Sequence, residues 1–180
     1  MFNFVKLFAT ILMTLATSAY AGSPKNADPF GFELGVASLS DVKSKVGPSN
    51  ITNKGINKYS NGAMIDVNSD YFEIDEVNSV LMIFDASDIL AGVIVNMRKN
   101  PVSMHQTLSK KYRTVRNTID SFMNHGSSKL AKGNSLVYID APHMSFKMDV
   151  RYVTNQLDKA FDQSVLEEAK SKQNHKEKSF

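Results

Sequence analysis

The order of hydrophobic and polar residues predicts a short helix near the start of the chain. Its apolar residues are spaced by three and four positions: Leu39, Val42 and Val46. Ser38 stands at the N-cap position with Asp41 three residues later, and Gly47-Pro48 follows the last apolar residue. These start and stop signals predict a helix over residues 38–46. Before it, alternating apolar residues in 30–36 predict either a short strand or a hydrophobic tether.

The segment from residue 50 to residue 97 changes to a period of two and is rich in β-branched residues. The candidate strands are residues 63–67, 79–84 and 89–97. The last two are joined by a four-residue turn, Asp85 to Asp88, which predicts an antiparallel hairpin. The pattern of residues 71–74 is ambiguous and predicts no single type of secondary structure.

The second half of the chain begins with another helix pattern. Ser103 is a candidate cap for a helix whose apolar stripe runs from Met104 to Tyr112. The helical spacing continues as far as residue 122, so a helix over 103–122 is one interpretation. The β-branched residues from Thr114 onward allow the other, in which the helix ends near Tyr112 and a strand follows.

Three more strands are predicted at residues 128–131, 136–139 and 144–153. The last alternates most regularly, and its apolar residues would share one face: Met144, Phe146, Met148, Val150 and Tyr152. Such a strand covers a core on one side and faces water on the other. A final helix is predicted over residues 155–172, with an apolar stripe beginning at Leu157.

This order of elements predicts an α+β fold built from two αβββ units. The units are pseudo-repeats of pattern, about 30–98 and 101–153, and together they would form one antiparallel sheet backed by helices. With the C-terminal helix they make a single domain over residues 22–172. The lysine-rich residues 173–180 are expected to form a disordered basic tail.

The N-terminus has the organisation of a cleavable signal peptide over residues 1–21. Lys6 precedes an apolar run of about eleven residues, and Ala19-Tyr20-Ala21 offers the small residues that signal peptidase requires. A membrane-spanning helix needs about 20 apolar residues, more than this run supplies. We therefore expect a periplasmic or secreted protein with no transmembrane segment after cleavage.

Composition narrows the possible chemistry. The chain has no cysteine, which excludes disulfides, thiolate metal sites, cysteine nucleophiles and a lipid-bearing cysteine after the signal. The formal charge of +3 is small. The basic cluster at residues 110–116 includes Tyr112, which lies on the apolar stripe, so specific nucleic-acid binding is not expected.

One stretch, residues 140–148, carries the candidate metal chemistry. His143 with Met144 or Met148 would suit copper(I), because imidazole and thioether ligands match that soft ion, and Asp140 would be an outer partner. In a strand, however, Met144 and Met148 share a face from which His143 points away. A proline-led turn feeding a core strand is the interpretation that we favour, and we predict no cofactor.

At the level of element order the chain resembles two groups of exported proteins. One is the tandem αβββ design of the beta-lactamase inhibitor protein. The other is the SmpA/OmlA type of outer-membrane assembly lipoproteins, which contain one such unit. The resemblance rests on Gly35-Val36-x-Ser38-Leu39-Ser40-Asp41-Val42-x-x-x-Val46-Gly47 and on the two meanders, and covers most of residues 30–153. It implies a fold that presents a sheet face or loops to another protein. Unlike the inhibitor this chain has no disulfides, and unlike the lipoproteins it has no cysteine to lipidate.

No catalytic motif supports an enzyme over a binding protein. A Gly-x-Ser-x-Gly elbow and a phosphate-binding glycine loop are both missing. We therefore expect an exported, non-enzymatic binding or inhibitor-like module that acts on a protein or an envelope component. The alternative is a periplasmic metal-binding protein or hydrolase that uses His143 and nearby acids.

Overall fold

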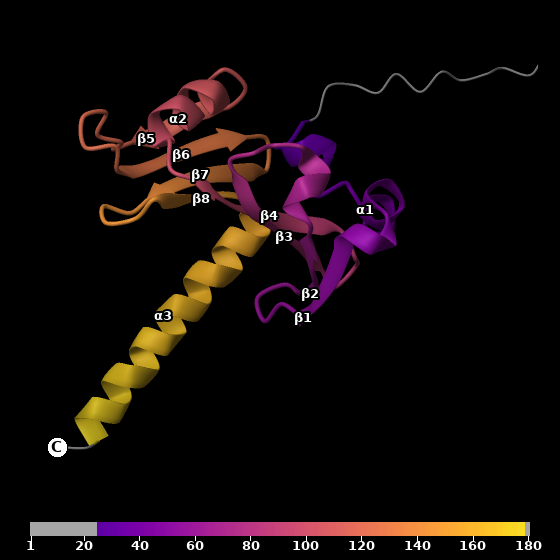
Figure 1. The fold of residues 1–180 in the computed structure, drawn as a ribbon. Helices are drawn as coiled ribbons and strands as arrows, with labels where there is room; N and C mark the ends of the chain where they lie inside the picture. The colour runs from indigo at the N-terminus through magenta and orange to yellow at the C-terminus, as the bar shows by residue number, and fades with distance from the viewer. Residues whose placement is uncertain (1–24, 179–180) are drawn as a thin grey trace, which may run out of the picture.

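Eight strands form one antiparallel sheet in the computed structural model, which describes residues 25–178 (Figure 1). The predicted α+β class, with an antiparallel sheet and a C-terminal helix, is confirmed. The predicted signal peptide, residues 1–21, lies outside the described residues.

The elements follow one another in two similar series. The first series is α1 (Leu39–Val46), β1 (Ile51–Ile56), β2 (Asn61–Val67), β3 (Val77–Asp85) and β4 (Leu90–Arg98). The second is α2 (Pro101–Ser109), β5 (Arg113–Asn117), β6 (Gly126–Lys132), β7 (Ser135–Ala141) and β8 (Lys147–Thr154). Helix α3 (Asn155–Lys178) ends the chain, and short 3-10 turns lie at Pro29–Gly31, Pro48–Asn50 and Ser69–Phe72.

The two series meet in the middle of the sheet. The strand order is β1-β2-β3-β4-β8-β7-β6-β5, so each half is a four-stranded meander that follows one helix. The halves join where β4 pairs antiparallel with β8, with Gly92 opposite Val153 and Arg98 opposite Lys147. The repeat is therefore present, but each unit is αββββ, and the sheet has eight strands rather than six.

The two additional strands are the edges of the sheet, β1 and β5. Five of the six residues of β1 and all five residues of β5 are exposed, so neither carries the alternation that marks a half-buried strand. Both edges are irregular, with register shifts between Asn53 and Gly55 and between Thr114 and Arg116. Bulges and charged side chains on an edge discourage pairing with other chains.

The helix boundaries follow from local signals where these are strong. Helix α1 has the predicted N-cap, because the Ser38 hydroxyl accepts a bond from Asp41 N (3.1 Å) and Asp41 Oδ2 accepts one from Ser38 N (2.9 Å). Helix α2 ends at Ser109, so the shorter interpretation of 103–122 is confirmed. Tyr112 turns into the core, and the chain continues as edge strand β5.

The main core lies on one face of the sheet, which we call the closed face. Helices α1 and α2 and the N-terminal segment 25–37 cover it. Its largest fully buried side chains are Phe84, Leu34, Met82, Leu90, Leu130, Ile139 and Met148. Segment 30–36 is the hydrophobic tether, because it forms turns that bury Phe32 and Leu34.

Strand β8 starts three residues later than predicted. Met148, Val150 and Tyr152 are buried as expected, but Met144 is 92% exposed and Phe146 is 94% exposed. The pairing with β4 ends at Lys147 and the pairing with β7 at Asp149. Residues 142–146 therefore form the turn between strands and have no neighbouring strand to pack on.

Helix α3 is longer than predicted and reaches Lys178, through most of the segment expected to be a disordered tail. Residues 155–178 contain no glycine or proline and are rich in Glu, Lys, Gln and Ala, which favour continuation. Only the start of α3 lies against the sheet, and the rest projects away (Figure 1). Within residues 25–178, no helix combines the length and apolar character needed to cross a bilayer.

Candidate binding groove

The second face of the sheet, which we call the open face, carries an apolar floor. The floor residues come from four adjacent strands: Met64 of β2, Leu81 and Ile83 of β3, Ile94 of β4 and Val153 of β8. The strand register makes them contiguous, because Met64 is opposite Ile83 and Leu81 is opposite Ile94. Leu81, Met64 and Ile94 are only half-buried.

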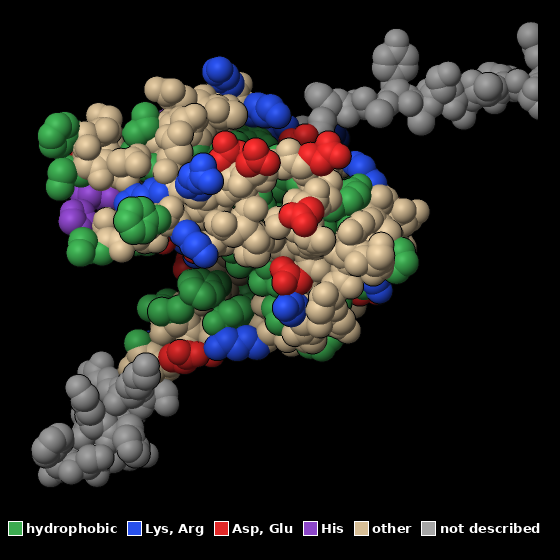
Figure 2. Space-filling model, viewed as in Figure 1, with side chains coloured by type: hydrophobic (Ala, Val, Ile, Leu, Met, Phe, Trp, Pro, Cys, Tyr) green, Lys and Arg blue, Asp and Glu red, His purple; other side chains and the backbone are tan. Residues whose placement is uncertain are grey.

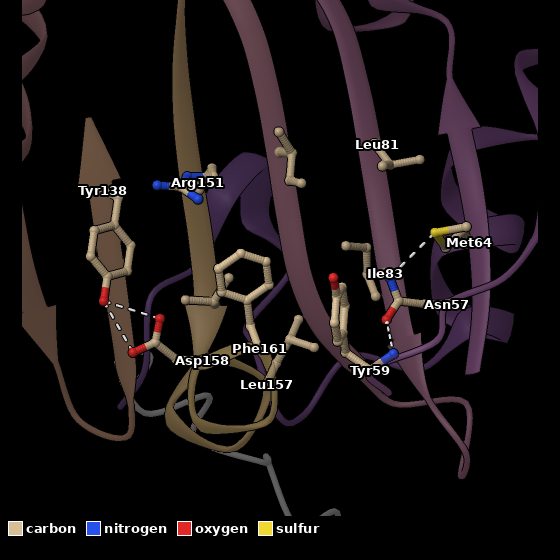
Figure 3. Close-up of a pocket in the computed structure, with 12 residues that line it drawn as sticks. Asn57, Tyr59, Met64, Leu81, Ile83, Tyr138, Arg151, Leu157, Asp158 and Phe161 are labelled. Carbon is tan, nitrogen blue, oxygen red and sulfur yellow. Dashed lines mark hydrogen bonds between the residues drawn. The ribbon is translucent and has the colours of Figure 1, made fainter. Parts of the chain in front are cut away.

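Helix α3 and the β1–β2 hairpin form the wall of the groove (Figure 3). Leu157 of α3 packs on the sheet with Ile83 and Ala91. One turn later, Phe161 meets the ring of Tyr59 edge to face, with 5.3 Å between centroids. Phe161 remains 41% exposed, so the wall is open on its outer side.

A glycine in β4 allows this docking of α3. A Cβ atom at Gly92 would lie 2.9 Å from Cδ2 of Leu157 and 3.4 Å from the carbonyl oxygen of Tyr152. A side chain at this position would require the terminal methyl of Leu157 to move. Gly92 thus leaves the space on the floor that the Leu157 side chain occupies.

The position of Tyr59 depends on a buried amide. Asn57 Oδ1 accepts bonds from the backbone nitrogens of Tyr59 (2.9 Å) and Ser60 (3.0 Å). Its Nδ2 donates to the sulfur of Met64 at 3.5 Å. One side chain therefore connects the hairpin tip with the floor (Figure 3).

The opposite rim of the groove is polar and centres on Tyr138 of β7. Its hydroxyl donates to the carboxylate of Asp158 on α3, with both oxygens at 3.0 Å. The Lys129 ammonium lies 5.0 Å and the Arg151 guanidinium 5.3 Å from the ring centroid. Burial raises the pKa of the Tyr138 hydroxyl, and the bond to Asp158 adds to that rise.

The groove has a volume of about 200 Å³. Sites for small molecules and cofactors have volumes of about 300–1,000 Å³, so this space matches a few side chains better than a cofactor.

In Figure 2, hydrophobic side chains gather in the hollow where α3 leaves the body. Across that hollow, Lys58 of the β1–β2 hairpin and Glu168 of α3 form an exposed ion pair of 3.2 Å.

The structure separates the metal ligands predicted from the sequence. Asp140, His143 and Met144 are exposed at the end of β7 and in the following turn, whereas Met148 is 1% exposed and points into the core. His143 instead meets His125, with 4.8 Å between ring centroids. Within the described residues, no three His, Cys, Asp or Glu side chains gather as a metal site. Metal binding at His143 is only the alternative interpretation of the sequence, and the ligand pair of His143 and Met148 on which it draws is not brought together in the structure.

The floor of the open face was not predicted from the sequence, although one signal for it was present. Residues 80–84 are apolar at consecutive positions, which indicates a strand covered on both faces. Leu81 and Ile83 are the residues of that run that face away from the main core. Sequence alone does not show that Ile94 and Val153 lie beside them.

Comparison with protein-family models, with curated proteins and with solved structures finds no match to this chain. The groove must therefore be interpreted from its own geometry.

Proposed function

We propose that the protein is an exported, non-enzymatic binding module that holds an apolar segment of another exported or envelope protein in the groove on its open face. One observation carries this proposal. The same strands that bury their closed face under two helices present a second apolar face that α3 covers only in part. A contiguous apolar surface that the fold itself leaves uncovered is typical of an interaction site.

The dimensions of the groove support a polypeptide segment as the ligand. Its volume suits two or three apolar side chains. Beyond the residues that line the groove, Val165 lies one turn after Phe161 on the same face of α3 and is 48% exposed. A segment lying along α3 would therefore contact the floor and the helix at once, as in other helix-and-groove complexes.

The rim carries both signs of charge, because the pKa of the Lys129 ammonium is raised by Tyr138 and also by the nearby carboxylates of Asp158 and Asp162. Lys129 and Arg151 flank Tyr138, and neither forms an ion pair within the described residues. A partner with polar groups beside its apolar residues would complement this mixed rim. The predicted signal peptide supports a partner in the periplasm or outside the cell.

The test uses two positions on one helix. A photo-reactive phenylalanine analogue is placed at Phe161, which faces the groove, or at Gln163, which lies outside it. Cells expressing the full chain with its own signal are irradiated. We expect a discrete, saturable cross-link at position 161 that is missing at 163.

The cross-linked protein is then purified, and its affinity for the mature chain is measured. Phe161→Ser should weaken binding at least about tenfold, because the apolar wall is lost, whereas Gln163→Ser should leave Kd unchanged. Equal cross-linking at both positions, or an unchanged Kd for Phe161→Ser, would overturn the proposal.

A further inference from the structure

A second unexplained surface lies at the tips of two hairpins in the C-terminal half. The β5–β6 loop carries Phe122 and Met123, and the β7–β8 turn carries Met144 and Phe146. Phe122, Met144 and Phe146 are 92%, 92% and 94% exposed, and Met123 is 50% exposed. The other exposed large apolar side chains of the described residues reach at most 68%. We call these four residues the hairpin-tip surface.

The two tips form one surface. Strands β6 and β7 pair up to Gly126 and Ala141, which brings the adjoining loops together. The rings of His125 and His143 then meet across the loops at 4.8 Å. In Figure 2, histidine side chains flanked by hydrophobic ones lie at the edge of the molecule beyond β6 and β7.

Hydrogen bonds hold both loops in shape, so these side chains are presented outward by a defined backbone. Asp120 Oδ1 accepts bonds from the backbone nitrogens of Phe122 and Met123, both at 2.8 Å. In the other loop, Ser145 Oγ accepts from Lys147 N at 3.0 Å, and Lys99 Nζ donates to the carbonyl of Pro142 at 2.6 Å.

Three cationic residues lie near Phe146 in the chain or across the sheet. Lys147 follows it in the chain, Arg98 is opposite Lys147 in the sheet, and Lys99 N donates to the carbonyl of Phe146 at 2.9 Å. None of these three cations forms an ion pair within the described residues. Four carboxylates lie in the neighbourhood: Asp120 and Asp140 at the loop ends, Asp149 opposite Asp140 and bonded to Asn96, and Glu76, whose carbonyl accepts from Arg98 N.

We propose that the hairpin-tip surface docks the protein on an anionic lipid bilayer. Phe122, Met144 and Phe146 would enter the boundary between headgroups and acyl chains, while Arg98, Lys99 and Lys147 contact the headgroups. Apolar groups with a cationic border bind such membranes by shallow insertion. A protein interface has an apolar core from which both partners exclude water. The hairpin-tip side chains instead project separately, which suits a lipid bilayer that deforms around each of them.

This inference is independent of the groove, because the two surfaces share no residue. The experiment exploits the absence of tryptophan from the chain. Phe146→Trp places a single fluorophore at the tip, and Phe161→Trp places one in the groove as the matched control. The mature chain is mixed with vesicles of phosphatidylglycerol and phosphatidylcholine, or of phosphatidylcholine alone.

We expect anionic vesicles to shift the emission of the Phe146→Trp protein to the blue, and brominated lipid to quench it, with neither effect at position 161. In flotation assays, Phe122→Ser with Phe146→Ser should lower partitioning by at least roughly tenfold. The same change at Val165 and Leu166 should leave it unchanged. Absence of a vesicle-dependent signal at position 146, or undiminished flotation of the Phe122→Ser, Phe146→Ser protein, would overturn the proposal and would point to a protein partner instead.

Discussion

The two faces of the sheet are built from the same strands but differ in how completely they are covered. On β3, Val80, Met82 and Phe84 are fully buried under α1, α2 and the N-terminal segment. On the other side of that strand, Leu81 is half-buried and Ile83 packs against the first turn of α3. The closed face therefore stabilises the fold, whereas the open face has more apolar side chains than α3 covers.

The largest expected effect is the loss of unfolding free energy when a buried side chain of the closed face is truncated, compared with one on the open face. Phe84→Ala should lower the free energy of unfolding by about 3–5 kcal/mol, because it leaves a cavity in a fully packed core. Leu81→Ala removes a side chain that is already half in water, so it should cost about 1 kcal/mol or less. Denaturant unfolding followed by circular dichroism measures both, and equal losses would contradict the division into a closed and an open face.

A smaller effect is expected where α3 meets the sheet. Gly92→Ala should cost about 1–3 kcal/mol, because its Cβ would lie 2.9 Å from Leu157 Cδ2. Hydrogen exchange should increase over the first turns of α3 and not in the strands of the closed face. Leu157→Ala serves as the control: in the double variant the losses should be less than additive, since the clash disappears. Strict additivity would show that Gly92 does not position the helix.

At alkaline pH, tyrosine ionisation should lower stability, and the contributions of the two faces should differ by less than the effects above. Burial raises the pKa of Tyr152 and Tyr112 on the closed face and of Tyr138 on the open face. Because these tyrosines ionise at lower pH in the unfolded chain, their contribution to stability should be constant below about pH 10 and then fall, by up to about 1.4 kcal/mol per pH unit for each tyrosine.

The contribution of each face to this fall can be separated by substitution. Tyr152 is 9% exposed, whereas Tyr138 lies half-buried at the rim. Tyr152→Phe should therefore remove more of the alkaline destabilisation than Tyr138→Phe. The check is the unfolding free energy of each variant on both sides of about pH 10; the reverse order would be inconsistent with the difference in burial.

Much of the fold could be predicted because its signals are local. The cap at Ser38 and the stop at Gly47-Pro48 lie within one short helix, and the apolar runs of β3 and β4 are long enough to indicate central strands. The edge strands could not be predicted in this way. Residues 51–56 and 113–117 are strands because they hydrogen-bond to β2 and β6, and their own pattern is polar and exposed.

The candidate sites depend still more on tertiary structure. The clean alternation from Met144 to Tyr152 could not show that Met144 and Phe146 lie beyond the last paired residue and therefore face solvent. Nor could it show that His143 meets His125, which is eighteen positions away in the sequence.

By itself, the sequence determined the α+β class, the two helix-and-meander units and the absence of cysteine chemistry, because periodicity, caps and composition are properties of adjacent residues. The tertiary structure decided that four strands place their apolar residues in one half-covered groove and that two loops bring Phe122, Met144 and Phe146 to a common surface. The physical reason is that these surfaces arise from strand register and from where pairing stops, and both depend on residues far apart in the chain.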